Sequence, residues 1–314
     1  MAYGIVTIAL LCLAIKGYCG KKTSGYVKNT GDSFFFNLLR MLFCILIGGA
    51  LVFIEGVQAS LRAEPGMLLI CLLAGASNAA FLAGWLLAIQ KNSMVSVDVC
   101  LTLGSIIPAV LCACFFGEAV SLLKMLGFAM ILAATVILAG HSKKTTGGGW
   151  LGILLLIIAS VGDGMSGFSQ QLYRQFYTEA GSLSHGAYYP KTVYHFYTYV
   201  FAAILLFALL LVFRTARRKS SGADKEKKEP LTLSASIVLY IFVMAVCLFA
   251  ANYLQTIATN DYGMPSQVLY PIIKGGCLIA VNFMAMIFFG EKMTPRSIFG
   301  SLVALCGMIS MSIL

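Results

Sequence analysis

Charged side chains are scarce in this sequence. Asp, Glu, Lys and Arg together make up 11% of the 314 residues, whereas hydrophobic residues make up 60%. A soluble domain carries roughly 25% charged residues, so this chain has too little charge to cover a surface that faces water. We therefore expect an all-α integral membrane protein. At roughly 20 residues a span, the length allows about ten transmembrane helices and no separate soluble domain.

The residues and motifs of metal sites and of membrane-embedded enzymes are also scarce. The sequence has three histidines, and its ten cysteines contain no C-x-x-C pair. Since nearly all the cysteines lie in apolar runs, we interpret them as packing residues rather than disulfides or metal ligands. Neither H-E-x-x-H nor G-x-S-x-G occurs, and these are typical of zinc proteases and serine hydrolases. We expect no metal, no cofactor and no catalytic residue.

The formal net charge of +10 would favour a nucleic-acid partner in a soluble protein. Here Lys and Arg concentrate between the apolar runs, where they orient the helices and contact anionic lipid, so we expect no nucleic-acid partner. One predicted membrane face has most of the basic residues, including Lys21, Lys22 and the segment Arg214–Lys228. The positive-inside rule puts this face in the cytoplasm and both termini outside.

Apolar runs bounded by charge, Gly or Pro predict where the helices lie. The first run lacks a basic start and a clear cleavage site, so we expect it to be retained rather than removed as a signal peptide. Pro108 lies within the fourth predicted span and Pro271 within the ninth, where a proline kinks a helix and frees a carbonyl. The predicted spans are residues 3–20, 34–54, 66–90, 94–116, 121–140, 150–173, 193–213, 232–257, 264–289 and 296–314.

Two segments match closely enough to indicate an internal duplication. One begins at Cys114 with CFFGEAVSLLKMLG, and the other begins at Ile287 with IFFGEKMTPRSIFG. In both, Phe-Phe-Gly-Glu closes a span and a glycine follows nine residues after the glutamate. The polar segment His141–Gly149 gives the boundary, so we expect five-helix repeats over residues 1–143 and 144–314. An odd number of helices in each half makes the two repeats inverted across the membrane.

A second match joins the first helices of the two halves. Lys16-Gly17 is followed by Gly20, and Asp163-Gly164 is followed by Gly167. Glycines three residues apart on a helix leave a shallow face, on which we expect a neighbouring backbone to approach closely.

The duplicated pattern resembles the EamA-type members of the drug/metabolite transporter superfamily. The features that carry the resemblance are the paired FFGE segments, Lys16 late in the first span and Arg40 near the start of the second. The resemblance covers essentially the whole chain and implies alternating-access transport. It does not imply one substrate, because members of the family carry amino acids, other metabolites, sugars, nucleotide sugars, lipids or drugs.

Several ionisable residues lie inside the predicted spans, with Lys274, Asp163 and Lys16 deepest and Asp98 nearer an end. A charge at the bilayer centre costs about 2.5–3.5 kcal/mol, so it normally faces a cavity or a partner. Helical spacing groups polar residues into five stripes. The stripes are Asp98–Thr102–Ser105, Gln267–Tyr270–Lys274, Asp163–Ser166–Gln170, Asn252–Gln255–Thr259 and Asn37–Arg40–Cys44.

We expect these stripes to surround a hydrated cavity that binds the substrate. Lys274 and Arg40 would hold an anionic group, while Asp163 or Asp98 would bind an ammonium or carry a coupling proton. The alternative is two internal ion pairs that form and break between inward and outward states. Helix packing is the alternative for Asn37, Asn78, Asn252 and Gln255, and snorkelling to the interface for Lys16. The predicted substrate-binding residues are Lys274, Arg40, Asp163, Asp98, Tyr270, Gln170, Asn252 and Lys16.

The sequence therefore predicts a secondary transporter of the plasma membrane that carries a small zwitterionic or anionic metabolite, by proton coupling or exchange. A multidrug or lipid exporter of the same fold and a membrane-embedded enzyme are the alternatives. The expected partners are the small-molecule substrate and the surrounding lipid, and no oligomeric state is indicated. A cluster of tyrosines predicts an interfacial aromatic belt, with stacking on a substrate as the alternative. The cluster comprises Tyr188, Tyr189, Tyr194, Tyr197 and Tyr199.

Overall fold

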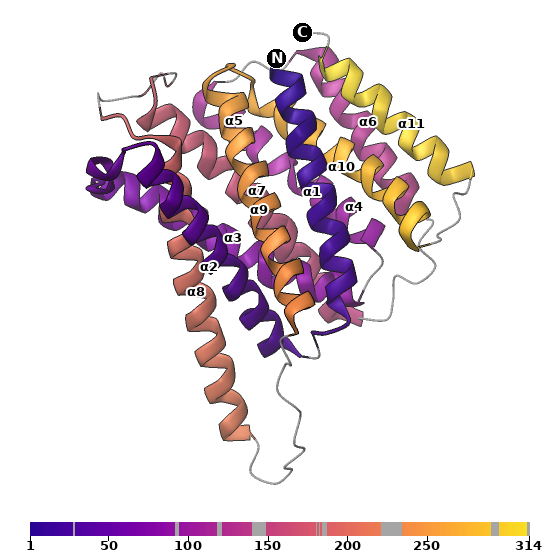
Figure 1. The fold of residues 1–314 in the computed structure, drawn as a ribbon. Helices are drawn as coiled ribbons and strands as arrows, with labels where there is room; N and C mark the ends of the chain where they lie inside the picture. Colours follow the sequence, from indigo (N-terminus) through magenta and orange to yellow (C-terminus); the bar gives the residue numbers. More distant parts are fainter. Residues whose placement is uncertain are drawn as a thin grey trace.

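The chain folds into a bundle of long helices (Figure 1). The structure, a computed structural model, describes residues 1–27, 29–91, 94–117, 121–139, 149–179, 181, 183, 187–220, 234–289 and 295–312. Within these ranges every regular element is helical. The elements are α1 (Ala2–Ser24), α2 (Thr30–Ile54), the 3-10 helix η1 (Gln58–Leu61), α3 (Pro65–Lys91), α4 (Met94–Gly104), α5 (Ile106–Phe116), α6 (Leu122–Ala139), α7 (Gly149–Tyr177), α8 (Lys191–Ser220), α9 (Ala235–Asn260), α10 (Ser266–Phe289) and α11 (Pro295–Ser312).

Seven of the described helices are long and apolar enough to cross a membrane, namely α1, α2, α3, α7, α8, α9 and α10. Large apolar side chains such as Leu46 and Phe53 are 67% and 70% exposed. Side chains of this kind suit a lipid environment, and the chain is a multi-span helical membrane protein. Shorter apolar stretches cover Cys100–Phe116, Met125–Ala134 and Ile298–Gly307. These lie in the other three predicted spans, so ten crossings stay a prediction.

Local chemistry sets several helix ends. The side chains of Asn29 and Ser234 accept hydrogen bonds from the backbone N–H groups three residues later, and so cap α2 and α9. The fourth predicted span breaks into α4 and α5 at Ser105, just before Pro108. A proline has no N–H to donate and crowds the preceding turn, which accounts for the interruption. Pro271, by contrast, lies inside the continuous helix α10.

The helices pack in pairs that are distant in sequence: α3 lies against α7 and α8, α1 against α9, α2 against α8, and α6 against α11. Glycines allow the closest of these contacts. A Cβ atom at Gly84 of α3 would lie 2.7 Å from the carbonyl oxygen of Leu155, and one at Gly162 of α7 would lie 2.5 Å from the backbone nitrogen of Phe81. Small residues of this kind let transmembrane backbones approach each other.

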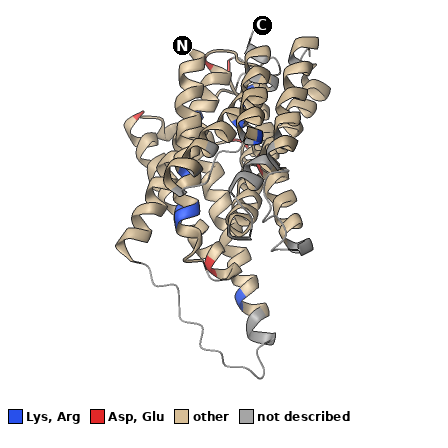
Figure 2. Cartoon of the chain, turned by 90° about the vertical axis from the view of Figure 1, so that its right-hand side faces the viewer, with Lys and Arg blue, Asp and Glu red and all other residues tan. Residues whose placement is uncertain are grey.

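The two chain ends lie close together at one end of the bundle, and α8 extends beyond the opposite end (Figure 1). Charged residues are few among the described positions and are scattered along the helices (Figure 2). Several predicted features lie outside the described residues: most of the boundary segment His141–Gly149, the glutamates Glu118 and Glu291, and most of the basic segment Arg214–Lys228. The internal duplication inferred from these segments therefore stays a prediction.

Candidate functional site

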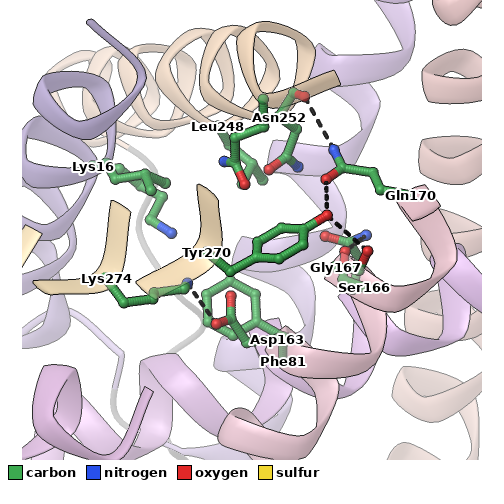
Figure 3. Close-up of a pocket in the computed structure, with 13 residues that line it drawn as sticks. Lys16, Phe81, Asp163, Ser166, Gly167, Gln170, Leu248, Asn252, Tyr270 and Lys274 are labelled. Atoms are coloured by element: carbon green, nitrogen blue, oxygen red, sulfur yellow. Dashed lines mark hydrogen bonds and ion pairs between the residues drawn. The ribbon is translucent and has the colours of Figure 1, made fainter. Parts of the chain in front are cut away.

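A small cavity lies in the middle of the bundle, where five helices meet (Figure 3). Its volume is about 30 Å³, which is enough for a water molecule and too small for a metabolite. We call it the central cavity. It is lined by Leu13 and Lys16 of α1, Asn78 and Phe81 of α3, Asp163, Ser166, Gly167 and Gln170 of α7, Leu248, Asn252 and Gln255 of α9, and Tyr270 and Lys274 of α10.

An ion pair joins the walls of the central cavity. Lys274 Nζ lies 2.5 Å from Asp163 Oδ2, and each side chain is only 15% exposed. The two residues come from α10 and α7, so the pair links two helices across the cavity (Figure 3). The sequence left two internal ion pairs as the alternative to direct substrate binding, and this arrangement is one ion pair of that kind.

A chain of hydrogen bonds closes the cavity on its other side. The Tyr270 hydroxyl lies 2.7 Å from the carbonyl oxygen of Gly167 and 3.0 Å from Oε1 of Gln170. The amide nitrogen of Gln170 donates to the Asn252 carbonyl and to Oγ1 of Thr256, both at 3.1 Å. Gly167 lets the Tyr270 ring approach closely, because a Cβ atom at this position would lie 3.0 Å from the ring.

Two further buried cations share one aromatic ring beside the cavity. Lys16 Nζ lies 4.8 Å from the ring centre of Phe81 and 5.1 Å from that of Trp85, and the Arg40 guanidinium lies 5.3 Å from Trp85. Lys16 is 6% exposed and Arg40 is fully buried, with its guanidinium donating a hydrogen bond to Asn37 Oδ1. Within the part of the chain that the structure describes, neither cation forms an ion pair.

The shared Gly-x-x-Gly frame marks two positions of close packing. At Gly20 of α1 a Cβ atom would overlap the ring of Trp85, and at Gly164 of α7 it would overlap the carbonyl of Gly104 in α4. The expected close approach of a neighbouring backbone is therefore present at Gly164. In α1 the neighbour is an aromatic ring rather than a backbone, and this contact holds Trp85 between the two cations.

The predicted site residues mostly come together. Lys16, Asp163, Gln170, Asn252, Tyr270 and Lys274 all line the central cavity. Arg40 does not line it and lies instead against Trp85. The side chain of Asp98 lies outside the described residues, although its backbone belongs to α4. The sequence interpretation missed Phe81 and Trp85. Aromatic residues in an apolar helix give no signal of their own, since most such residues pack against lipid or core.

A second and larger hollow opens at the end of the bundle that holds the N-terminus, where the Tyr262 hydroxyl lies 3.9 Å from the Met1 sulfur. Its volume is about 650 Å³, and we call it the tyrosine vestibule. It is lined by Glu55, Ser60, Tyr173, Tyr177, Thr178, Glu179, Tyr188, Tyr189, Pro190, Lys191, Tyr253, Asn260 and Asp261.

Specific polar contacts order the rim of the tyrosine vestibule. Lys191 Nζ lies 2.7 Å from Asp261 Oδ2 and 5.9 Å from the ring centre of Tyr253. Glu55 accepts hydrogen bonds from Thr192 Oγ1 at 2.5 Å and from the Tyr253 hydroxyl at 3.1 Å. These contacts join α2, α8 and α9 at one end of the bundle.

A layer of stacked rings adjoins the tyrosine vestibule at Tyr173, which is one of its lining residues. Tyr173 and Tyr194 stack with ring centres 4.4 Å apart, and His195 Nε2 lies 2.9 Å from Oγ1 of Thr256. Tyr194 and Tyr199 are 1% and 0% exposed. The predicted interfacial belt is therefore wrong for these two tyrosines. Tyr194 stacks on Tyr173 of α7 and the Tyr199 hydroxyl accepts a hydrogen bond from Asn252 of α9, so both face neighbouring helices rather than lipid.

Among the described residues, no group of three His, Cys, Asp or Glu side chains could hold a metal ion. The chain matches no family model and no curated protein in sequence. It does match 28 solved chains in structure. One of them, described only as "Crystal structure of protein", is 14% identical and has a TM-score of 0.72, with 98% of this chain and 95% of that chain covered. The two chains share a fold. At 14% identity, the similarity shows a common fold and assigns neither a substrate nor a mechanism to this chain.

Proposed function

We propose that this protein is an alternating-access secondary transporter of the EamA type, located in the plasma membrane, for a small metabolite with an anionic or zwitterionic group. The observation that carries the proposal is the charge around the central cavity. Lys16, Lys274 and Arg40 gather within or beside it, and Asp163 is the carboxylate among its described lining residues. A substrate anion would balance this excess of positive charge.

The energetic argument rests on the cost of burying charge. A buried ion without a partner costs several kcal/mol, and removing one partner of a buried pair costs about 3–5 kcal/mol. Lys16 and Arg40 have only aromatic faces and an amide oxygen as described partners. The attraction between these cations and a carboxylate or phosphate beside them would be far stronger than in water, and it would offset the cost of burying the cations. A substrate ammonium could replace Lys274 at Asp163, which suits a zwitterion or a coupling proton.

The pattern of helix contacts supports an inverted repeat. If α1 corresponds to α7, α3 to α9, and α4 with α5 to α10, the contact of α1 with α9 corresponds to that of α7 with α3. In the same way, the contact of α1 with α10 corresponds to that of α7 with α4, and both are present. Inverted repeats exchange their conformations in alternating access, and their substrate sites lie near the middle of the membrane.

The small central cavity is in keeping with a closed state of such a cycle. Gln170 of α7 lines the central cavity, and Tyr173, about one turn further along the same helix, lines the tyrosine vestibule and stacks on Tyr194. In this proposal the layer opens to admit a substrate, and the ion pair of Lys274 and Asp163 then exchanges partners. We favour a carrier over an enzyme because the cavity couples opposite charges rather than a nucleophile with a base.

The test starts with a thermal-shift screen of the detergent-purified protein against anionic and zwitterionic metabolites. A ligand at 100 times its dissociation constant stabilises the folded state by about 2.7 kcal/mol. The hit is then assayed for counterflow of its labelled form in proteoliposomes. Lys16→Gln should weaken binding at least tenfold, whereas Lys22→Gln, at an exposed position of the same helix, should leave binding unchanged.

The outcomes separate the parts of the proposal. Binding that survives Lys16→Gln would overturn the location of the site. Binding without counterflow, in vesicles that contain correctly folded protein, would overturn the transport function. A hit restricted to cationic compounds would overturn the anionic substrate class.

A further inference from the structure

The tyrosine vestibule combines aromatic rings with an excess of negative charge. Five tyrosines line it, and three carboxylates, those of Glu55, Glu179 and Asp261, face one ammonium group, that of Lys191. Carboxylates and tyrosine faces share one kind of preferred ligand, since both attract organic cations. The central cavity has the opposite balance of charge, so the two spaces select different chemical groups.

The ammonium group of Lys191 shows how a cation would be held there. It lies 5.9 Å from the centre of the Tyr253 ring and 2.7 Å from an oxygen of Asp261. A carboxylate and an aromatic face thus contact the same charged nitrogen. The side chain is 27% exposed, so it lies at the border of the vestibule, where an external ammonium group can compete with it.

Glu55 is held in place on the same rim. One of its oxygens accepts from Thr192 Oγ1 and the other from the Tyr253 hydroxyl, while the residue stays exposed. Among the described residues Glu55 forms no ion pair. Its carboxylate is therefore oriented, negatively charged and open to the vestibule, beside the ring that Lys191 contacts. Such fixed groups bind a ligand with little further loss of conformational freedom.

We propose that the tyrosine vestibule is a binding site for an organic ammonium group, with Glu55, Asp261 and the ring of Tyr253 as its principal contacts. The volume of about 650 Å³ accommodates a small organic molecule. Lys191 acts as an internal competitor for this position. The site goes beyond the proposed transport function, because an ammonium ligand can bind here whether or not it is carried across the membrane.

The probe for the test is benzyltrimethylammonium chloride, measured by isothermal titration calorimetry against the full-length protein in detergent. Benzyl alcohol and benzoate serve as neutral and anionic controls. Glu55→Gln should weaken binding of the probe three- to tenfold, because it removes the charge and keeps the shape. Lys191→Gln should strengthen binding by a similar factor, since it frees Asp261 and the Tyr253 ring, whereas Lys191→Arg should leave the affinity near that of the wild type.

Glu55→Gln and Lys191→Gln should change the affinity for the probe in opposite directions. This result distinguishes a binding site on the protein from partition of the probe into the detergent micelle. Equal heats for all variants, or for benzyl alcohol and the ammonium probe, would overturn the proposal. Probe binding that is lost in Asp163→Asn but retained in Glu55→Gln would place the ammonium in the central cavity and overturn it as well. Failure of counterflow in the transport assay would leave this binding site unaffected, so the two proposals fail separately. Far-ultraviolet circular dichroism verifies that each variant is folded.

Discussion

The central cavity and the tyrosine vestibule use similar residue types in opposite ways. The central cavity is small and buried, and has an excess of basic residues. The vestibule is open and has an excess of acidic residues. Each contains one lysine–carboxylate pair, Lys274–Asp163 with both side chains 15% exposed and Lys191–Asp261 with side chains 27% and 46% exposed. The same pair of charged groups therefore occurs in two different dielectric environments.

The difference in burial determines how much each ion pair contributes to the stability of the fold. Two unit charges at contact attract far more strongly in a low-dielectric interior than at a wet surface, but the interior also makes each unpaired charge costly. We therefore expect that removing one member of the central pair strongly destabilises the protein, because the other member is then buried without its partner. The vestibule pair should be almost neutral for folding and free to exchange for a ligand.

The largest expected effect comes from breaking the central pair. Asp163→Asn leaves Lys274 buried without a carboxylate, so the free energy of unfolding should fall by about 3 kcal/mol. Lys274→Met should have a similar cost. The double variant should recover much of the loss, since neither member of this pair is then left as a buried charge without the other. Thermal unfolding of the detergent-solubilised protein measures all three. Additive losses in the double variant would show that the two residues are not coupled.

A substitution at Gly20 tests how tightly the central region is packed. In Gly20→Ala the new methyl group would overlap the Trp85 ring, which is only 1% exposed. Overpacking of this kind costs about 1–3 kcal/mol, and it should displace Trp85 from Lys16 and Arg40. Gly4→Ala is the control in the same helix, because nothing lies within 4 Å of its added Cβ. The unfolding temperature measures the loss of stability. The fluorescence of Trp85 reports its displacement, when all variants are made in a Trp150→Phe protein that has no other tryptophan.

The fold was the more predictable part of the molecule. Lipid imposes long apolar runs, so predicted spans such as 34–54 and 66–90 lie within one or a few residues of α2 (Thr30–Ile54) and α3 (Pro65–Lys91). The span predicted at 193–213 is too short, since α8 continues to Ser220. Hydropathy detects where lipid ends, whereas a helix continues as long as its backbone hydrogen bonds are satisfied.

The sites were predictable only where a charge lies within an apolar run. Lys274 and Asp163 stand out in this way, and they do meet in the structure. Glu55, Lys191 and Asp261 lie at helix ends, where charged residues are ordinary, so no local signal marks them. Their proximity follows from the packing of α2, α8 and α9, which depends on contacts distant in sequence. The position of Trp85 between two cations depends on the same kind of contact.

A smaller effect should follow from removing one hydroxyl group at the central cavity. Tyr270→Phe keeps the ring against Gly167 but removes the hydrogen bond that reaches Gly167 and Gln170. A buried hydrogen bond contributes about 1 kcal/mol, so the free energy of unfolding should fall by that amount. Tyr262→Phe is the matched control, because this exposed hydroxyl contacts only the Met1 sulfur among its recorded partners. Equal effects of the two variants would mean that the hydroxyl of Tyr270 has no structural role.

The smallest expected effect lies at the vestibule pair. Lys191→Gln removes an ion pair whose acidic partner, Asp261, is 46% exposed. Surface pairs contribute about 0–1 kcal/mol, and salt screens them. The unfolding temperature should therefore change little at low salt and not at all at 1 M salt, while the Asp163→Asn variant should stay destabilised at both. A loss in Lys191→Gln as large as that in Asp163→Asn would show that the vestibule is as tightly coupled to folding as the cavity. A small, salt-dependent change would leave Lys191 free to yield its place to an external ammonium.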